Sequence, residues 1–267
     1  MGPDAGQRNF MLARYNPDGS LDGTFGSGGI VITRIAPGDN NDVATTNGLT
    51  ITDAGKFILS GQANMGAGAG GVNLALARYN PDGTLDGSFG IGGIVTTAVA
   101  PGDNFDTASS VAIDPAGKIV AGGVAESGGF LFDWALVRYN SDGSLDNSFG
   151  AGGKVTTNVS PGNSDDDQEE LVIQSTGKIL IGGSVAPTAV TVDSDFAVAR
   201  YNVDGTLDSS FGSGGIVKTN TAAGTGSDEI YEVELQSDAK LIASGECDRA
   251  VTERDVCIAR YKVGEDD

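Results

Sequence analysis

The stretch RYNPDGSLDGTFGSGG (residues 14–29) decides how the chain is read, because it returns three more times. The copies are RYNPDGTLDGSFGIGG from Arg78, RYNSDGSLDNSFGAGG from Arg138 and RYNVDGTLDSSFGSGG from Arg200, and a fifth copy begins at Arg260 and matches for two residues only. The first residues of successive copies lie 64, 60, 62 and 60 positions apart. A near-constant period of this length is the signature of a repeat architecture.

Each repeat is expected to form four short antiparallel strands. In the second unit a β-branched run (93–97), an alternating run (111–113) and two further apolar runs (118–123 and 133–139) are separated by loops and by the turn DPAG (114–117). Runs of this length between Gly, Pro and Asp clusters are typical of strands joined by hairpins. No segment keeps a helical period over more than two turns, so the sequence predicts an all-β fold.

The strand that ends in Arg-Tyr carries different side chains on its two faces. Bulky residues share one face: Phe10, Leu74, Trp134, Phe196 and Val256, and two positions later Leu12, Leu76, Leu136, Val198 and Ile258. Mostly small residues lie between them: Met11, Ala75, Ala135, Ala197 and Cys257. A small-residue face implies that another sheet packs closely against it, and a four-stranded sheet buried on both faces is a propeller blade. We therefore expect a β-propeller-like array of four four-stranded antiparallel blades.

The repeated motif also resembles a known family. The pattern ARYNPDGSLDxSFGxGG, followed by GK(I/F)(L/V)xxG and a return to ARYN, is similar to the delta-60 repeat of bacterial surface and secreted proteins, and it covers residues 9–262. The resemblance implies a propeller-like array that is usually extracellular and has no well-defined catalytic residues. The last unit departs from the pattern, because SDAK (237–240) replaces the usual turn Gly and the loop 221–226 is looser, as in a terminal cap.

The repeats set the expected domain boundaries. Residues 1–8 are expected to be a disordered lead-in or an addition from cloning, and residues 9–267 to form one repeat domain. Its units are 9–72, 73–132, 133–194 and 195–254, with a closing strand at 255–262.

If the Arg-Tyr strand is the outer strand of each blade, the chain has five outer strands for four blades. The surplus N-terminal strand either lies beside the last blade, leaves to complete a neighbouring molecule, or marks a chain cut from a longer array. An unpaired strand edge invites strand addition. We therefore predict self-assembly by strand donation through Phe10, Met11, Leu12, Ala13, Arg14 and Tyr15.

Composition excludes several classes of function. The net charge of −20, from 16 Lys and Arg against 36 Asp and Glu, argues against nucleic acid and anionic membranes as partners. The sequence has no His, which removes Ser-His-Asp and Cys-His nucleophiles and His-ligated metals, and two Cys are too few for a zinc or iron–sulfur centre. No apolar run of 18 residues or more encodes a membrane span, and MGPDAGQRNF does not read as a signal peptide.

Calcium is the one cofactor that the acids suggest. Asn16, Asp18, Ser20 and Asp22 space oxygens as calcium loops do, although Pro-Asp-Gly and Ser-Asp-Gly are also turn formers and we favour a turn. A second acidic series is densest at Asp165, Asp166, Asp167, Glu169 and Glu170. Such a charge run is usually a solvated loop. We name Asp165, Asp166, Asp167 and Glu169 as weak calcium candidates.

Three further sets of residues have structural interpretations. The repeated arginines (Arg14, Arg78, Arg138, Arg200, Arg260) recur too regularly for catalysis, and each is expected to pair with a repeat Asp such as Asp22 and to bind blade to blade. The repeated lysines (Lys56, Lys118, Lys178, Lys240) follow a hairpin turn and are expected to decorate it. Cys247 and Cys257 are either two small buried residues or a cross-strand disulfide formed in an oxidising compartment.

These observations favour a structural function. Paired carboxylates could run glycoside hydrolysis, but an active site should break the repeat, whereas the acids recur in nearly every copy and a platform of aromatic residues for sugar stacking is not visible. We expect a non-enzymatic, structural or adhesive extracellular protein that assembles with itself. The alternative is a propeller module that binds carbohydrate or calcium, and a glycoside hydrolase-like propeller comes third.

Overall fold

The strands lie where the alternating runs predict them. The computed structural model describes residues 8–36, 41–66, 71–102, 104–128, 131–160, 166–186, 194–220, 226–250 and 253–264. These residues form strands and turns, and no helix long and apolar enough to cross a membrane occurs among them. The expected lead-in, apart from Arg8, lies outside this part of the chain.

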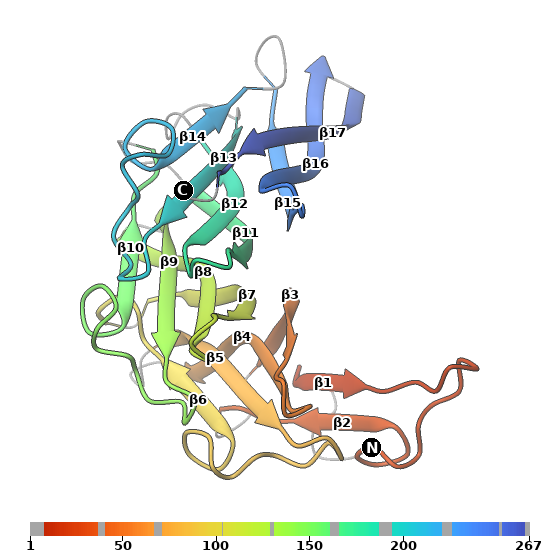
Figure 1. Cartoon of the computed structure of the whole chain (residues 1–267). Coiled ribbons are helices and arrows are strands. Elements are labelled where there is room, and N and C mark those ends of the chain that lie inside the picture. The colour runs from red at the N-terminus through yellow and green to blue at the C-terminus, as the bar shows by residue number, and fades with distance from the viewer. Residues whose placement is uncertain are drawn as a thin grey trace.

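Within the described residues, three blades have four strands each and two are partial (Figure 1). The complete blades are β3 (Val43–Ile51), β4 (Phe57–Gly66), β5 (Gly71–Tyr79) and β6 (Ile94–Thr97); β7 (Asp106–Ile113), β8 (Ile119–Gly128), β9 (Leu131–Tyr139) and β10 (Lys154–Thr157); and β11 (Asp166–Ile173), β12 (Ile179–Val185), β13 (Asp195–Tyr201) and β14 (Ile216–Thr219). The partial blades are β1 (Phe10–Ala13) with β2 (Ile30–Thr33), and β15 (Asp228–Leu235) with β16 (Lys240–Ala250) and β17 (Glu253–Lys262).

The blades follow one another along an arc, with the β1–β2 sheet at one end and the β15–β17 sheet at the other (Figure 1). The first strand of each blade lies at the inner side of the arc. There β3 and β7 form a single parallel pair, Asn47 with Ser110. Asn47 also donates through Nδ2 to the carbonyl of Tyr231 on β15, 3.2 Å away, so the first and last of these strands touch. The predicted all-β, propeller-like fold is confirmed.

The expected order of strands within a blade was wrong by one position. We expected the Arg-Tyr strand to be outermost and the strand after the Gly pair to be innermost. In each complete blade the Arg-Tyr strand is third, and the four-residue strand after the Gly pair, such as β6, is outermost. The four-residue strand β6 is hydrogen-bonded to β5 along one edge only, and its Thr96 is exposed. Both are properties of an edge strand.

Packing between blades follows the two faces predicted for the Arg-Tyr strand. The bulky pairs Leu74 and Leu76, Trp134 and Leu136, and Phe196 and Val198 are almost fully buried. Leu74 and Leu76 pack against Ala108, Val111 and Ala121 of the next blade. Each such side chain contributes about 1.5–3 kcal/mol when buried. Every junction between successive complete blades is therefore a small hydrophobic core of its own.

A glycine allows the first two strands of each blade to approach closely. At Gly123 a Cβ atom would lie 1.9 Å from the carbonyl oxygen of Thr107, beside the bulge between Ala108 and Ser110. A residue with a side chain cannot occupy this place without moving the backbone. Gly61, Gly183 and Gly245 hold the same place in the other blades.

Candidate functional site

The repeated arginines form a clasp with the acid eight residues later. Arg14 pairs with Asp22, Arg78 with Asp86, Arg138 with Asp146 and Arg200 with Asp208, at distances of 2.8, 2.6, 2.9 and 2.7 Å. Each guanidinium also lies over a Phe ring of the same loop, as Arg138 does over Phe149 at 4.5 Å. The predicted Arg–Asp pairing is confirmed, but it lies within one repeat.

The bond from blade to blade is made by the other end of the guanidinium. Nη1 of Arg14, Arg78, Arg138 and Arg200 donates to the carbonyl of Pro81, Ser141, Val203 and Val263 in the next repeat. Beside it, the N–H of Gly26, Gly90 and Gly150 donates to the carbonyl of Asp82, Asp142 and Asp204, 2.8 Å away in each case. One clasp thus fastens each loop to the turn of the following blade.

Three of the repeated lysines belong to the clasp, which the sequence analysis missed. Lys56, Lys118 and Lys178 lie 2.6, 3.5 and 3.0 Å from Asp86, Asp146 and Asp208. A hydrogen bond from Ser148 and the charges of Arg138 and Lys118 outweigh burial and lower the pKa of Asp146 to about 2. The signal for this role was the fixed spacing between Lys and Asp, 30 residues in the first and third of these pairs.

The loops with calcium-like spacing are turns. Asp18 accepts hydrogen bonds from the backbone N–H and hydroxyl of Ser20, and Asp22 accepts the same pair from Thr24. These carboxylates are occupied within their own turns, as the turn interpretation predicts.

The second acidic series is not uniformly solvated, because one of its acids is buried while Asp167 is exposed. Asp166 is fully buried and accepts backbone N–H groups of Val159 and Ser160, at 2.7 and 3.2 Å. Asp42 and Asp106 hold the equivalent segments of their repeats in the same way. Burial raises the pKa of Asp166 to about 6 despite these hydrogen bonds. Of the other calcium candidates, Asp165 lies outside the described residues.

Asp167 and Glu169 gather with Glu229 around a small cavity of about 200 Å³ that Ser184 and Ser194 also line. Burial, together with the charges of Asp167 and Glu229, raises the pKa of Glu169 to about 7. Among the residues that the structure describes, no three His, Cys, Asp or Glu side chains are grouped so as to hold a metal ion. We therefore propose no calcium site.

Glu169 breaks the repeat, contrary to our expectation that the acids recur. It is the bulged residue of β11, where β7 has Ser109 and β15 has Tyr231. A bulge turns its side chain out of the regular alternation and is frequent beside active sites. The acids of this segment are evident in the sequence, whereas the bulge depends on pairing with β12.

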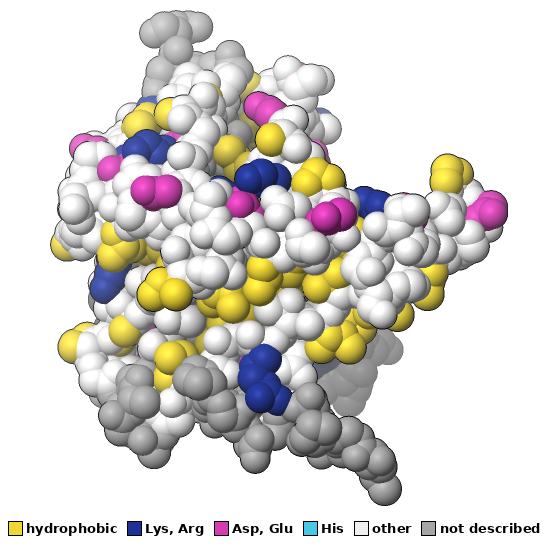
Figure 2. All heavy atoms as spheres, turned by 90° about the horizontal axis from the view of Figure 1, so that it is seen from below, with side chains coloured by type: hydrophobic (Ala, Val, Ile, Leu, Met, Phe, Trp, Pro, Cys, Tyr) yellow, Lys and Arg dark blue, Asp and Glu magenta, His cyan; other side chains and the backbone are white. Residues whose placement is uncertain are grey.

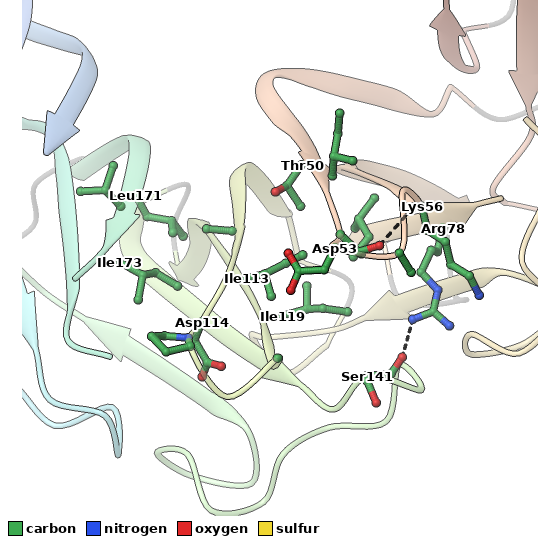
Figure 3. Close-up of a pocket in the computed structure, with 18 of the residues that line it drawn as sticks. Thr50, Asp53, Lys56, Arg78, Ile113, Asp114, Ile119, Ser141, Leu171 and Ile173 are labelled. Atoms are coloured by element: carbon green, nitrogen blue, oxygen red, sulfur yellow. Dashed lines mark hydrogen bonds between the residues drawn. The ribbon is translucent and has the colours of Figure 1, made fainter. Parts of the chain in front are cut away.

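An axial cavity of about 1130 Å³ lies at the ends of the four innermost strands. Its wall is built from residues 50–54, 112–115, 171–175 and 234–235, one segment from each of β3, β7, β11 and β15 and the turns that follow (Figure 3). Figure 3 shows Ile113, Asp114 and Ile119 of one blade facing Thr50 and Asp53 of another, with the Asp53 carboxylate directed into the cavity. The sequence alone does not predict this cavity, because its wall comes from four repeats.

The cavity wall combines a constant and a variable set of side chains. The constant set is aliphatic: Ile51, Ile113, Ile173 and Leu235. The variable set comes one residue earlier on each strand: Thr50, Ala112, Val172 and Glu234. The repeats thus differ from one another where they line the cavity.

The two basic side chains that line the cavity already have an acidic partner. Lys56 and Arg78 line it, but both lie 2.6 Å from Asp86. Asp114 accepts the backbone N–H groups of Ala116 and Lys118 and so holds its own turn. Within the described residues, the carboxylate groups of Asp53 and Glu234 have no hydrogen bond or ion pair. The groups available to bind a ligand are therefore carboxylate oxygen atoms beside the aliphatic side chains of the wall.

The remaining predicted residues lie at the two ends of the arc. Cys247 on β16 and Cys257 on β17 are joined in a disulfide, with 5.8 Å between their Cα atoms. The residues predicted to be donated, 10–13, form β1, which pairs with β2 of its own chain and buries Phe10 and Leu12 against the next blade. Arg14 and Tyr15 follow β1, Arg14 in the first clasp and Tyr15 largely exposed.

Solved structures of low sequence identity align with the chain. A protein of unknown function from Dyadobacter fermentans is 12% identical with a TM-score of 0.49, over 81% of this chain and 52% of its own, so this chain spans about half its length. An endo-arabinase from Bacteroides thetaiotaomicron is 13% identical with a TM-score of 0.42, over 86% of this chain and 75% of its own. A GH43 endo-arabinanase from Bacillus licheniformis is 14% identical with a TM-score of 0.42, over 83% and 72%.

These neighbours correct one expectation. We expected the chain to have no enzymatic activity, and that expectation does not stand, since the structures that align with it include an endo-arabinase and a GH43 endo-arabinanase. Likeness at these TM-scores says nothing of what this chain acts on. A comparison with curated proteins gives no match.

A family model matches the chain once in each repeat. Its description is a domain of unknown function (DUF5122) beta-propeller, and the matched residues are 2–25, 55–89, 115–149 and 174–211. Each of the four segments contains both members of its Arg–Asp clasp, Arg14 with Asp22, Arg78 with Asp86, Arg138 with Asp146 and Arg200 with Asp208. The repeats of this chain are therefore similar to those of a β-propeller family.

Proposed function

We propose that the chain is a ligand-binding propeller that holds a carbohydrate in the axial cavity. The observation that carries this is the variation of Thr50, Ala112, Val172 and Glu234 on an otherwise repeated wall. Structural positions of a repeat stay alike, as the clasps do, whereas positions that recognise an asymmetric ligand must differ from blade to blade. A cavity of about 1130 Å³ has room for an oligosaccharide segment.

The chemistry of the wall fits a neutral, hydroxyl-rich molecule. Aliphatic side chains such as Ile51 and Ile113 offer surface to the C–H faces of a sugar ring. Carboxylates such as Asp53 and Glu234 accept hydrogen bonds from hydroxyl groups. Both cations that line the cavity in the described part of the chain, Lys56 and Arg78, are paired with Asp86, which disfavours a phosphate or other anion as the ligand. The delta-60 resemblance supports an extracellular glycan as the ligand.

The test is a glycan array followed by titration calorimetry with the whole chain. Asp53→Asn and Glu234→Gln should each weaken binding of the best glycan at least tenfold. Asp18→Asn is the matched control, because this acid bonds only within its own turn and should leave binding unchanged. Absence of any glycan ligand, or equal affinity for all three variants, contradicts the proposal.

A second candidate function is glycoside hydrolysis at Glu169. The specific observation is an acid that is protonated near neutral pH, since its pKa is raised to about 7, beside the carboxylates of Asp167 and Glu229. One protonated and one ionised carboxyl group are what acid–base cleavage of a glycosidic bond requires. Glu169 would act as the acid, and one of its neighbours as base or nucleophile.

Hydrolysis is tested with arabinan and with aryl glycosides of several sugars. Glu169→Gln should lower turnover at least a hundredfold, whereas Asp238→Asn, which removes an exposed partner of Lys240 away from this cavity, should not change it. Turnover that survives Glu169→Gln, or is absent on every substrate, rejects this second candidate and leaves the axial cavity proposal standing.

A further inference from the structure

The two end sheets of the arc expose apolar residues that interior blades bury. On β17, Val256 and Ile258 are 83% and 70% exposed. They hold the positions of Leu74 and Leu76 on β5, of Trp134 and Leu136 on β9, and of Phe196 and Val198 on β13, all 0–1% exposed. The apolar face that one blade contributes to a junction is thus exposed on β17.

The β1–β2 sheet at the other end is apolar where the repeat is not. Met11 and Ile32 are directly opposite in the strand register, and they are 59% and 69% exposed. The equivalent pairs of interior blades are Ala75 with Thr96, Ala135 with Thr156 and Ala197 with Lys218. An exposed methionine and isoleucine replace small and polar residues here, so the repeat pattern alone does not account for them.

The space-filling view shows the extent of such surface. Figure 2 looks at the molecule from below, the side on which β2 and β6 lie in Figure 1, and hydrophobic side chains form a band across it with charged side chains on either side. An apolar band with a polar border is typical of an interaction surface.

We propose that the Val256–Ile258 face of one copy packs on the Met11–Ile32 face of a second copy, head to tail. The contact continues the junction that joins successive blades within the chain, in which the bulky face of one Arg-Tyr strand covers the small face of the next. Met11 and Ile32 enlarge the apolar area of the half-blade that receives it. The partner is therefore another molecule of this chain.

The clasp supplies a polar contact at the same interface. In the four junctions within the chain, the repeat arginine donates to the carbonyl that opens the next turn: Pro81, Ser141, Val203 and Val263. The equivalent carbonyl of the first repeat belongs to Pro17, and Arg260 is the arginine of the last. Arg260 of one copy would thus donate to Pro17 of the next.

This mode differs from the donation of β1 that the sequence suggested, because β1 stays paired with β2. It is also heterologous, since the two surfaces in contact are different parts of the molecule. A heterologous contact repeats until the rotation closes a ring or a filament grows.

The experiment is sedimentation velocity and light scattering of the whole chain over a concentration series. The mass of the natural chain should rise with concentration. Met11→Ala with Ile32→Thr, which restores residues that fold in the interior blades, should raise the dissociation constant at least tenfold. Ile91→Thr is the control, because Ile91 is 91% exposed but lies on neither end sheet.

A charge exchange tests the head-to-tail geometry. Met11→Lys and Ile258→Glu should each be monomeric alone and associate when mixed, because Lys then meets Glu. Circular dichroism and thermal unfolding establish that each variant is folded. A monomer at every concentration, or association unchanged by the Met11 and Ile32 substitutions, overturns the proposal. Association that survives Ile258→Glu also overturns it, since the contact would then join two β1–β2 sheets.

Discussion

Arg138 donates through Nε to Asp146, 2.9 Å away, in a pair that is almost closed to solvent. Lys118 approaches the same carboxylate, and the other end of the guanidinium reaches the next blade. The same arginine therefore neutralises an acid of its own repeat and attaches the following blade. The contribution of the clasp to stability can be compared between repeats, because the arginine side chain is exposed to different extents in them.

Arg138→Ala should lower the free energy of unfolding by about 3 kcal/mol, since it leaves Asp146 buried without its main partner. Arg14→Ala should cost about 1 kcal/mol, because the Arg14 side chain is 32% exposed against 7% for Arg138. Urea unfolding followed by circular dichroism measures both. Equal losses would show that burial does not set the strength of the clasp.

The clasp acids should make the protein sensitive to strong acid. The folded pKa of Asp146 is lowered to about 2 from 3.8, so its contribution is fully present above pH 3.8 and is lost as the pH falls through 2. Asp86 and Asp208 are shifted in the same direction, both by hydrogen bonds that outweigh their burial. The free energy of unfolding should therefore fall between pH 4 and pH 2, and Asp146→Asn should reduce that slope.

Glu169→Gln should stabilise the fold in mild alkali. Its folded pKa is raised to about 7 from 4.5, so the neutral form is favoured on folding, and this contribution is present below pH 4.5 and lost as the pH rises through 7. The variant should gain about 1–2 kcal/mol over the natural chain at pH 8, an amount reduced for partial solvation, and nothing at pH 4. Thermal unfolding at the two pH values measures the difference, and a gain at pH 4 would contradict the assignment.

Reduction of Cys247–Cys257 should loosen the last sheet first. The bond closes a separation of 10 residues between β16 and β17, and its loss should cost about 2 kcal/mol. Amide hydrogen exchange with and without a thiol reductant should show faster exchange in β16 and β17. The pair β8 and β9, which contains no cysteine, serves as the internal control and should not change.

The sequence predicts which face a side chain occupies better than where a strand sits. Alternation of bulky and small residues along 134–137 correctly predicts a strand with a bulky and a small face, both of them buried, because the period of two is a local property. The place of that strand within the blade depends on pairing with residues far along the chain, and β9 proved to be third rather than outermost. Hence the repeat count and fold class could be predicted, and the strand order could not.

The candidate sites were less predictable for the same reason. The Arg–Asp pairs could be identified because both residues recur at a fixed spacing. The axial cavity could not, since Thr50, Ala112, Val172 and Glu234 meet only when four blades converge. The bulge at Glu169 was equally hidden, because a bulge depends on the register with β12.

The clasp between blades has a consequence for how such a chain can change in length. Each clasp joins a loop to the turn about sixty residues further on, as the hydrogen bond from Arg78 to the carbonyl of Ser141 does. Among the described residues, no clasp extends past the following repeat. Duplicating one unit within a gene would therefore add one blade and one clasp and leave the other clasps unchanged. Deleting a unit would let the two flanking blades meet through the same contacts. The number of blades can thus change by whole units without loss of the remaining clasps, whereas the contact of Asn47 with Tyr231 and the shape of the axial cavity would change with it.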